Sequence, residues 1–285
     1  MVEEGGVVMG LEGVVVPEAR ARYMQDGVCL CRGPVLPPDV VAGANAGMDA
    51  LLQGVYETGT APQPSYWNPG DDAQKLVKIE MPQVANRSVM ALVGHPALGE
   101  LAAAVTDAAM VQVWWVQMLI KPPTVPGGAG SPHVGWHQDR QYWRSWEDGS
   151  ELFTAWVAVS DVTPDAGPVM YVRGSQRWGL LEQGDFFAKD YAVQRGQLAL
   201  PAGEEWEEIA GVLPPGGVSF HHQLTVHGSG DNRSGAPRRS FAIHLRTERS
   251  RPVNNTRQGL TALIDDPAYC PVIYGDRTLD WARSG

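Results

Sequence analysis

Positive charge is scarce in this chain of 285 residues, which has 22 lysine and arginine residues against 32 aspartate and glutamate residues. The formal net charge of −10 argues against a nucleic-acid partner, because phosphate binding depends on clustered lysine and arginine side chains. The same deficit argues against adhesion to an anionic membrane surface. The charge balance therefore disfavours two large classes of partner.

Long hydrophobic runs are also missing, since no segment approaches the roughly eighteen consecutive apolar residues that a membrane-spanning helix needs. The N-terminal sequence MVEEGGVVMGLEG has no basic region and no long apolar stretch, so we expect no signal peptide. Cysteine is rare, and Cys29, Cys31 and Cys270 are odd in number and lack CxxC spacing. We therefore expect a cytoplasmic protein. No feature of the sequence indicates an oligomeric state.

Helices are expected before residue 110. The stretch PPDVVAGANAGMDALLQG has proline in its first turn, and HPALGELAAAVTDAAM, at 95–110, is amphipathic. The earlier stretch YMQDGVCLCRG is typical of a helix end followed by a strand. These patterns predict a helix-rich N-terminal part over about 16–110.

The residues after 110 have a different pattern, which favours strands. Short β-rich runs bounded by turn-forming residues follow one another, namely VQVWWVQMLIK, ELFTAWVAVSDV, GPVMYVRGS, GGVSFHHQ and RRSFAIHLR. Close strands without intervening helices favour an antiparallel sandwich, barrel or jelly roll. We expect a mainly β fold with flanking helices (α+β), in a single domain over 1–285. Its core would cover about 111–247, followed by an extension over 248–285.

The stretch HVGWHQDRQYW, at 133–143, contains a candidate metal site. Side chains two apart on a strand share a face, so His137 and Asp139 can bind one ion together. His133 has the helical metal spacing to His137, but Pro132 and Gly135 disfavour a helix there. An isolated HxD pattern also occurs on solvated surfaces, so it indicates a metal site only if the sequence offers a third ligand.

The third ligand is expected in GGVSFHHQLTVHGSGDNRSGAPRRSFAIHLR, which offers His221, His222 and His227. Two histidines and one carboxylate form the facial triad of non-haem Fe(II) oxygenases, which leaves three coordination positions open. A 2-oxo acid takes two of these positions and dioxygen the third. The distal carboxylate of such an acid needs a fixed cation, and arginine binds carboxylates through two parallel hydrogen bonds.

Four segments resemble, in order, the phytanoyl-CoA dioxygenase (PhyH) family of Fe(II)/2-oxoglutarate-dependent oxygenases: MLIKPP at 118–123, WHQDRQYW, FTAWVAVSDVTPDAGPVMYVRGSQRWG and VHGSGDNRSGAPRRS. YMQDGVCLCRGPVLPPDVV resembles the family's opening, so the resemblance covers most of 20–247. It implies a double-stranded β-helix, also called a jelly-roll or cupin-like fold, with helices packed on one side. It also implies Fe(II) and 2-oxoglutarate as cofactors and O₂ as co-substrate.

Residue by residue, the resemblance makes His137, Asp139 and His227 the catalytic metal ligands. It implies that 2-oxoglutarate is bound by a further set of residues: Arg238, with Arg239 as the alternative anchor, Ser229, Lys121, Trp156 and Gln117. The chain departs from the family at Arg173-Gly174-Ser175-Gln176, where many members have Pro-Gly-Ser-His. That departure bears on the substrate and leaves the iron site unaffected.

Strand periodicity adds to this interpretation. One face of the last β-run carries Arg238, Ser240, Ala242 and His244, whereas Arg239, Phe241, Ile243 and Leu245 share the other. In the same way, Thr154 and Trp156 lie opposite Phe153, Ala155 and Val157. The polar or small faces suit a cavity that holds a dianionic cofactor, and the apolar faces suit sheet packing.

Aromatic residues close to the metal motif are the candidate substrate contacts. Tyr142, Trp143 and Trp146 would form an apolar wall, although core packing explains them equally well. Trp67, with Tyr66, would belong to a lid. Among the other histidines, His221 and His222 are expected to support the site, His244 to be buried and hydrogen-bonded, and His95 to lie at the surface.

The expected reaction is oxidation of a C–H bond of a small organic molecule, with release of succinate and CO₂. Hydroxylation is one outcome, and cyclisation, desaturation or epimerisation are others; Asp139 argues against a halogenase, which needs a small residue there. The Ala-, Gly-, Val- and Arg-rich composition is typical of GC-rich bacteria and suggests secondary metabolism, such as antibiotic biosynthesis. The alternatives are a non-catalytic jelly-roll protein that binds a small molecule or metal, and a metal hydrolase on the same scaffold, which leaves Arg238 without a role.

Overall fold

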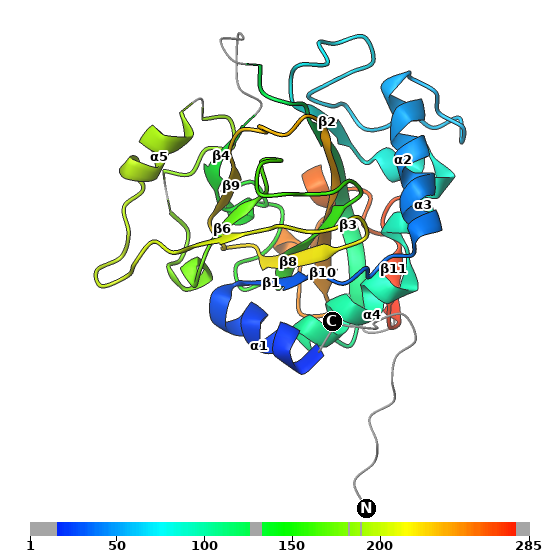
Figure 1. The fold of residues 1–285 in the computed structure, drawn as a ribbon. Coiled ribbons are helices and arrows are strands. Elements are labelled where there is room, and N and C mark those ends of the chain that lie inside the picture. The colour runs from blue at the N-terminus through cyan, green and yellow to red at the C-terminus, as the bar shows by residue number, and fades with distance from the viewer. Residues whose placement is uncertain (1–15, 126–132, 182, 189, 278–285) are drawn as a thin grey trace, which may run out of the picture.

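The computed structural model describes residues 16–125, 133–181, 183–188 and 190–277 (Figure 1). Two antiparallel sheets form its centre. The larger has seven strands, in the order β1-β8-β5-β10-β3-β11, with β2 also paired to β3. The smaller has four strands, in the order β4-β9-β6-β7. Side chains of the two sheets pack together through a cluster that includes Trp156 and Ala242 from one and Tyr171 from the other.

Each β-run expected from the sequence forms a strand, and the structure adds strands that were not expected, among them β2, β7 and β11. Those of the large sheet are β1 (Val28–Cys31), β2 (Val77–Glu80), β3 (Val111–Lys121), β5 (Leu152–Ala158), β8 (Val218–His222), β10 (Arg238–Thr247) and β11 (Val272–Tyr274). Those of the small sheet are β4 (Val134–His137), β6 (Met170–Val172), β7 (Glu208–Ala210) and β9 (His227–Ser229). The expected mainly β, jelly-roll fold is confirmed.

Four helices cover the outer face of the large sheet, as expected from the sequence (Figure 1). They are α1 (Val16–Asp26), α2 (Pro38–Leu52), α3 (Arg87–Val93) and α4 (Pro96–Thr106), while α5 (Tyr191–Gln197) lies beside the small sheet. The alternation on β10 produces this packing, because Phe241, Ile243 and Leu245 point under the helices. The opposite face of β10 is directed into a cavity.

The structure also contains short 3-10 turns, of which two involve residues that were singled out from the sequence. They are η1 (Pro82–Val84), η2 (Asp139–Gln141), η3 (Ser175–Arg177), η4 (Val253–Asn255) and η5 (Gly259–Thr261). The strand β4 ends at His137 and η2 begins at Asp139, so Asp139 lies on a turn and not on the strand that its spacing to His137 predicted. The turn η3 contains Gln176, whose side-chain amide donates to the carbonyls of Met24 and Gln25 near the end of α1. The segment at which the chain departs from its family thus packs against a helix.

One segment, Arg87–Thr106, is long and apolar enough to cross a membrane by composition alone, and 61% of its most apolar window is buried inside the protein. It consists of two helices, because α3 ends at Val93 and α4 begins at Pro96. His95 caps α4 by accepting a hydrogen bond from the Ala97 N–H and is half-buried, whereas we expected a surface histidine. The segment is thus a pair of core helices.

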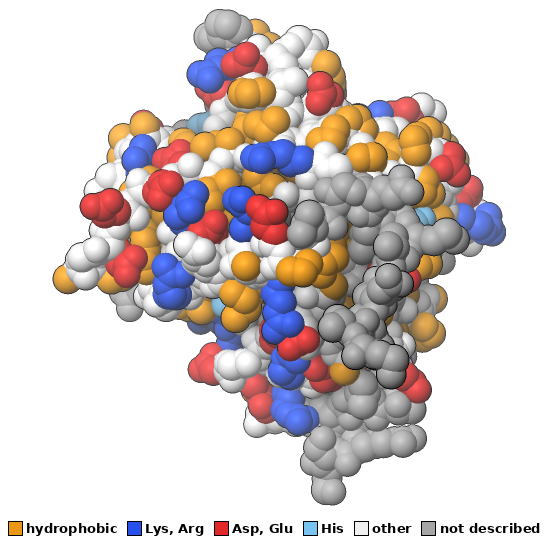
Figure 2. Space-filling view, turned by 60° about the horizontal axis from the view of Figure 1, so that its bottom comes forward, with side chains coloured by type: hydrophobic (Ala, Val, Ile, Leu, Met, Phe, Trp, Pro, Cys, Tyr) orange, Lys and Arg blue, Asp and Glu red, His pale blue; other side chains and the backbone are white. Residues whose placement is uncertain are grey.

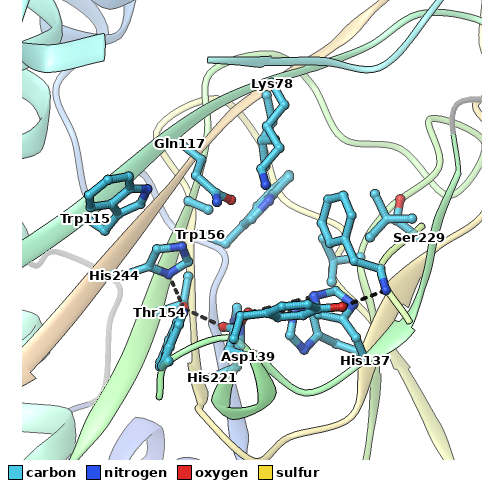
Figure 3. A pocket seen from close by; sticks show the side chains of 18 of the residues that line it. Lys78, Trp115, Gln117, His137, Asp139, Thr154, Trp156, His221, Ser229 and His244 are labelled. Carbon is cyan, nitrogen blue, oxygen red and sulfur yellow. Dashed lines mark hydrogen bonds and ion pairs between the residues drawn. The ribbon is translucent and has the colours of Figure 1, made fainter. Parts of the chain in front are cut away.

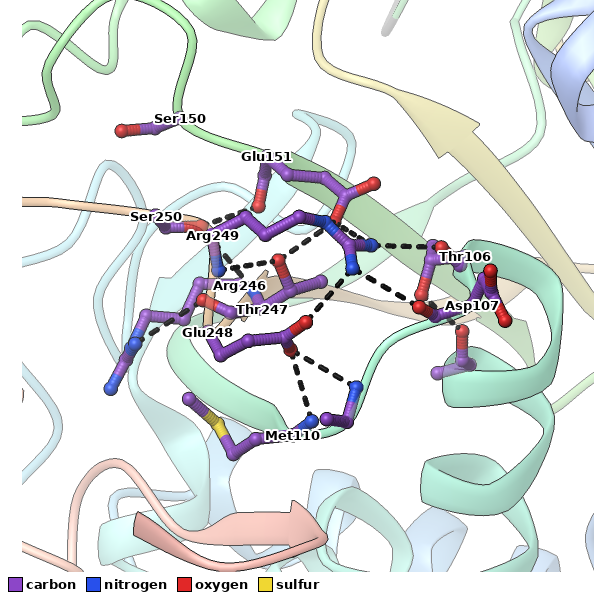
Figure 4. A network of polar contacts seen from close by, with 12 residues as sticks. Thr106, Asp107, Met110, Ser150, Glu151, Arg246, Thr247, Glu248, Arg249 and Ser250 are labelled. Atoms are coloured by element: carbon purple, nitrogen blue, oxygen red, sulfur yellow. Dashed lines mark hydrogen bonds and ion pairs between the residues drawn. The ribbon is translucent and has the colours of Figure 1, made fainter. Parts of the chain in front are cut away.

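The end of α4 is tied to the sheet by Arg249, in a polar network that Figure 4 shows. Its guanidinium donates to the carbonyls of Thr106 (2.9 Å) and Asp107 (3.1 Å), and to the carboxylate of Glu151 (2.8 Å). A cation at a helix C-terminus satisfies carbonyls that have no partner within the helix. On the face seen in Figure 2, lysine and arginine side chains are interspersed with acidic and hydrophobic ones.

Replacing Arg249 with alanine is expected to lower the free energy of unfolding by about 1 kcal/mol, because four hydrogen bonds are lost at a partly exposed site. Urea denaturation followed by circular dichroism measures the change. Arg249→Lys keeps the charge but cannot reach all the acceptors, so it should recover only part of the loss. An alanine variant as stable as the parent would show that the network contributes nothing.

Candidate metal centre and cofactor pocket

Two histidines meet where the strands of the small sheet pair. His137 is the last residue of β4, His227 is the first of β9, and the two are direct partners in the register. Asp139 follows in η2, and its Oδ1 lies 3.8 Å from His137 Nε2 and 3.7 Å from His227 Nε2. The ligand atoms of all three lie within 4.8 Å of one another, and all three residues are buried. The structure thus brings the predicted triad together, in an arrangement that suits one metal ion.

The histidine rings are oriented by the backbone. His137 Nδ1 lies 2.8 Å from the carbonyl of Gly135, and His227 Nδ1 lies 2.9 Å from that of Thr225. A carbonyl only accepts, so each Nδ1 carries the proton and each Nε2 keeps its lone pair for the metal. This is the tautomer that metal binding needs.

The protonation states of the triad also fit a divalent ion. Burial lowers the pKa of His137 and that of His227 below the ordinary histidine value, so both imidazoles are neutral. Burial alone raises the pKa of Asp139, but His227 and a hydrogen bond from His221 outweigh it and hold this pKa well below its usual range. A carboxylate and two neutral imidazoles bind a metal without first releasing protons.

A cavity of about 490 Å³ opens over the triad (Figure 3). Its lining includes Ser229, Arg238, Trp156 and Gln117, four of the residues expected at the 2-oxoglutarate site. The volume is typical of a small-molecule site. The metal ligands and most of the predicted cofactor residues thus surround one cavity.

Arg238 and Ser229 form the cationic end of this cavity. Arg238 Nη1 donates to Ser229 Oγ (2.9 Å) and to the carbonyl of Gly167, and the guanidinium carbon lies 5.2 Å from the Trp156 ring centroid. Its Nε is buried without a partner. Burial lowers the pKa of Arg238 to about 10, so the side chain stays charged at neutral pH. A buried arginine with a free N–H is suited to a carboxylate.

Two of the cofactor assignments need correction. Lys121 is fully buried but does not line the cavity: its Nζ donates to Ser229 Oγ (2.6 Å) and to the carbonyls of Ser229 and Gly230. It therefore holds the Ser229 side chain in place without lining the cavity. Arg239, the alternative anchor, points to the helical side of the sheet, where its Nη2 lies 2.7 Å from Asp49 Oδ1. Strand alternation separates it from its neighbour Arg238.

The aromatic candidates divide into two groups. Tyr142 and Trp143 line the cavity. Trp146 does not, since it is buried against Trp114 with ring centroids 5.6 Å apart. Trp67 is also absent from the lining and belongs to the core under the helices, where its indole N–H donates to the carbonyl of Asp72. The structure thus places neither side chain in the cavity lining, and an aromatic pattern in the sequence does not distinguish a core position from a cavity wall.

The edges of the cavity include a segment that we expected to form a lid. Pro64 lines the cavity, and the exposed ring of Tyr66 lies 5.5 Å from that of Phe187, another lining residue. The sequence PPTVPGGAGSPHVG, just before His137, predicts a loop that shapes the mouth of the pocket, and its residues 126–132 lie outside the described residues. His133 stands apart from the metal cluster, with its Nδ1 3.9 Å from Asp231.

The cavity also contains a pair of charged residues that was not predicted from the sequence. Lys78 and Glu80, on β2, both line it; Lys78 Nζ lies 3.2 Å from Glu80 Oε1 and 4.8 Å from the Phe186 ring centroid. Glu80 Oε2 accepts a hydrogen bond from the Trp115 indole (2.6 Å). The alternation in VKIE indicates that Lys78 and Glu80 share a face, but nothing in that stretch says which sheet edge β2 joins.

The supporting histidines differ in position. His221 lines the cavity and reaches Asp139, whereas His222, next to it on β8, points away and accepts a hydrogen bond from the Leu224 N–H. His244 is buried and hydrogen-bonded to Thr154, as expected. His221 and His244 thus belong to the surroundings of the metal site, and His222 does not.

The fold and the site together define a class of protein, a double-stranded β-helix whose small sheet presents two histidines and an aspartate to one metal ion. The model of the phytanoyl-CoA dioxygenase (PhyH) family matches residues 23–240, so the chain belongs to that family. A probable phytanoyl-CoA dioxygenase of Caenorhabditis elegans is 28% identical over 133 residues, which are 45% of this chain and 40% of that protein. The chain thus matches less than half the length of this relative.

Solved structures share the fold over most of their length. The non-haem α-ketoglutarate-dependent carbocyclase SnoK from nogalamycin biosynthesis superposes with a TM-score of 0.64 and 21% identity, covering 87% of this chain and 89% of SnoK. The epimerase SnoN, in complex with Fe³⁺, α-ketoglutarate and nogalamycin RO, gives a TM-score of 0.63 and 20% identity, covering 88% of this chain and 89% of SnoN. At these identities the likeness concerns the fold.

Acidification is expected to destabilise the protein through its buried neutral histidines. Burial lowers the pKa values of His222 and His244 to about 4, while the unfolded chain keeps the ordinary value. The unfolded state therefore binds more protons between about pH 6.5 and pH 4, so the free energy of unfolding falls as the pH falls through this window.

Denaturant melts at several pH values measure this slope, which is at most about 1.4 kcal/mol per pH unit for each proton taken up. His222→Asn removes one such proton and should flatten the slope between pH 6.5 and pH 4. An unchanged slope in this variant would contradict the burial argument for His222.

Proposed function

We propose that this chain oxidises a C–H bond of a small organic molecule with Fe(II), 2-oxoglutarate and O₂, and releases succinate and CO₂. The observation that carries the proposal is that one cavity holds both a metal triad and a buried arginine with a free N–H. A metal hydrolase or a binding protein would use the triad, but would leave the buried Nε of Arg238 without a partner. A cofactor with a carboxylate distant from the metal uses both parts.

The residues divide the work among them. His137, Asp139 and His227 would hold the metal and leave three positions open. Arg238 and Ser229 would bind the distal carboxylate of 2-oxoglutarate. When bound, iron, 2-oxoglutarate and dioxygen supply an oxidant able to take a hydrogen atom from an unactivated C–H bond, while the protein supplies positioning.

Lys78 is a second cation, in addition to Arg238, in the lining of the cavity. It is near enough to His137 and His244 to help lower the pKa values of both, and it can therefore balance part of the cofactor's double negative charge. The described lining of the cavity carries two cationic side chains, Lys78 and Arg238, and two carboxylates, Glu80 and Asp139. Because Fe(II) and 2-oxoglutarate also cancel in charge, the loaded cavity suits an uncharged substrate.

The substrate is proposed to be a secondary metabolite with an apolar ring system. Tyr142, Trp143, Trp115 and Phe186 present aromatic surface to the cavity, and flat apolar groups stack well on such surface. SnoK and SnoN, which share the fold, belong to nogalamycin biosynthesis and are a carbocyclase and an epimerase. Hydroxylation, cyclisation and epimerisation are therefore the outcomes proposed for this chain, in a cytoplasmic enzyme.

Anaerobic addition of Fe(II) and 2-oxoglutarate to the metal-free protein should produce a metal-to-ligand charge-transfer band. Admission of O₂ with a substrate should then produce succinate. His227→Ala should lose the band, because two ligands remain where three are needed. A protein that binds Fe(II) but shows neither the band nor succinate, with any candidate substrate, would exclude this function.

Arg238→Ala is expected to raise the dissociation constant of 2-oxoglutarate by roughly 10- to 100-fold, the value of a charge-assisted hydrogen-bonded pair. Titration of the charge-transfer band measures it. Arg239→Ala is the matched control, since Arg239 pairs with Asp49 on the other face of the strand and should leave the constant unchanged. Equal effects of the two substitutions would mean that Arg238 is not the anchor.

A further inference from the structure

Three neighbouring strands of the large sheet place a row of polar side chains opposite the metal site. Thr154 on β5 is the register partner of His221 on β8 and of His244 on β10. All three line the cavity and are buried. Because direct partners on adjacent strands point to the same face, the row His221–Thr154–His244 faces the small sheet as a unit. Asp139 is the group that it meets (Figure 3).

The row makes its contacts with one oxygen of Asp139 only. Thr154 Oγ1 donates to Asp139 Oδ2 over 2.8 Å, and His221 Nε2 lies 3.3 Å from the same oxygen. The other oxygen, Oδ1, faces the Nε2 atoms of the two metal-binding histidines, at 3.7 and 3.8 Å. The two oxygens of this carboxylate therefore have separate partners.

The direction of the hydrogen bonds follows from the single proton of the Thr154 hydroxyl. Since that proton goes to Asp139, the hydroxyl oxygen accepts from His244 Nδ1, which lies 2.8 Å away. His244 in turn packs against both Trp114 and Trp143, with ring centroids 5.5 and 4.9 Å from its own. The hydroxyl is thus oriented by an imidazole that is itself packed against two indoles.

We infer that Thr154 and His221 are positioning residues that hold Asp139 as a one-oxygen metal ligand. With Oδ2 engaged by the row, only Oδ1 is available to the metal. A carboxylate that bound through both oxygens would occupy one of the three open positions. A two-position cofactor and dioxygen need all three, so the row keeps the site able to hold both.

The need for three open positions rests on the proposed function. The binding of a metal by one oxygen of Asp139 can be tested with a metal ion alone. Co(II) is the probe, because its visible d–d bands depend on the type and arrangement of its ligands. Thr154→Val keeps the shape of the side chain and removes the hydroxyl. It should weaken Co(II) binding by about 10- to 100-fold, as removal of a partner of a metal ligand usually does, and change the d–d spectrum as Oδ2 takes one of the open positions.

Two further variants separate positioning from general damage. Thr154→Ser restores the hydroxyl and should return both the affinity and the spectrum to those of the parent. His221→Phe removes the second donor and should act in the same direction as Thr154→Val. His222→Phe makes the same change one residue along β8, on a side chain that does not touch Asp139, and should leave the Co(II) spectrum unchanged.

The inference is overturned if Thr154→Val and His221→Phe both bind Co(II) with the same affinity and the same spectrum as the unmodified protein. Failure of Thr154→Ser to restore them would overturn it as well, since the hydroxyl would then not be the cause. Circular dichroism identifies a variant that fails to fold, and His221→Phe then decides the question alone. Parent protein that binds Co(II) but gives no charge-transfer band with Fe(II) and 2-oxoglutarate would remove the proposed function while leaving the positioning intact.

Discussion

The buried carboxylate of Asp139 is the interaction on which the rest of the site depends. A carboxylate removed from water is costly unless donors engage it, and here the Thr154 hydroxyl and the His221 imidazole donate to Oδ2. The other oxygen, Oδ1, faces the Nε2 atoms of His137 and His227. Thr154 and His221 lie on β5 and β8 of the large sheet, whereas His137 and His227 lie on β4 and β9 of the small sheet, so these surroundings of the carboxylate form only when the two sheets are packed together. The geometry of the metal site therefore depends on the packing of the two sheets against each other.

Strand alternation keeps this polar interior apart from the apolar core. On β5 and β10, one set of side chains faces the helices and the other faces the cavity, with no residue serving both. Arg238 and Arg239 are adjacent in sequence, yet one lies at the cofactor end of the cavity and the other on the helical surface. The helices α1–α4 seal the apolar side, which leaves the opposite face free to carry charge.

Periodic and local features were predicted from the sequence, and the structure agrees with them. The strand runs after residue 110, the helix that begins at Pro38 and the two faces of β10 all follow from patterns within about ten residues. The spacing of His137 and Asp139, set beside His227 and the two arginines, indicated a metal and a carboxylate ligand. The aromatic residues were less informative, because Trp143 and Trp146 belong to the same core cluster and only Trp143 also lines the cavity.

The sequence by itself thus determined most of the long strands and helices, the identity of the candidate metal ligands and the sign of charge around them. Only the tertiary structure decided which distant strands became neighbours. The register of β8, β5 and β10 aligned His221, Thr154 and His244, and the pairing of β2 with β3 brought Lys78 and Glu80 into the cavity. The physical reason is that strand pairing joins residues far apart in the sequence, such as Val28 and His221, through backbone hydrogen bonds, and the local pattern of side chains does not show which strands will pair.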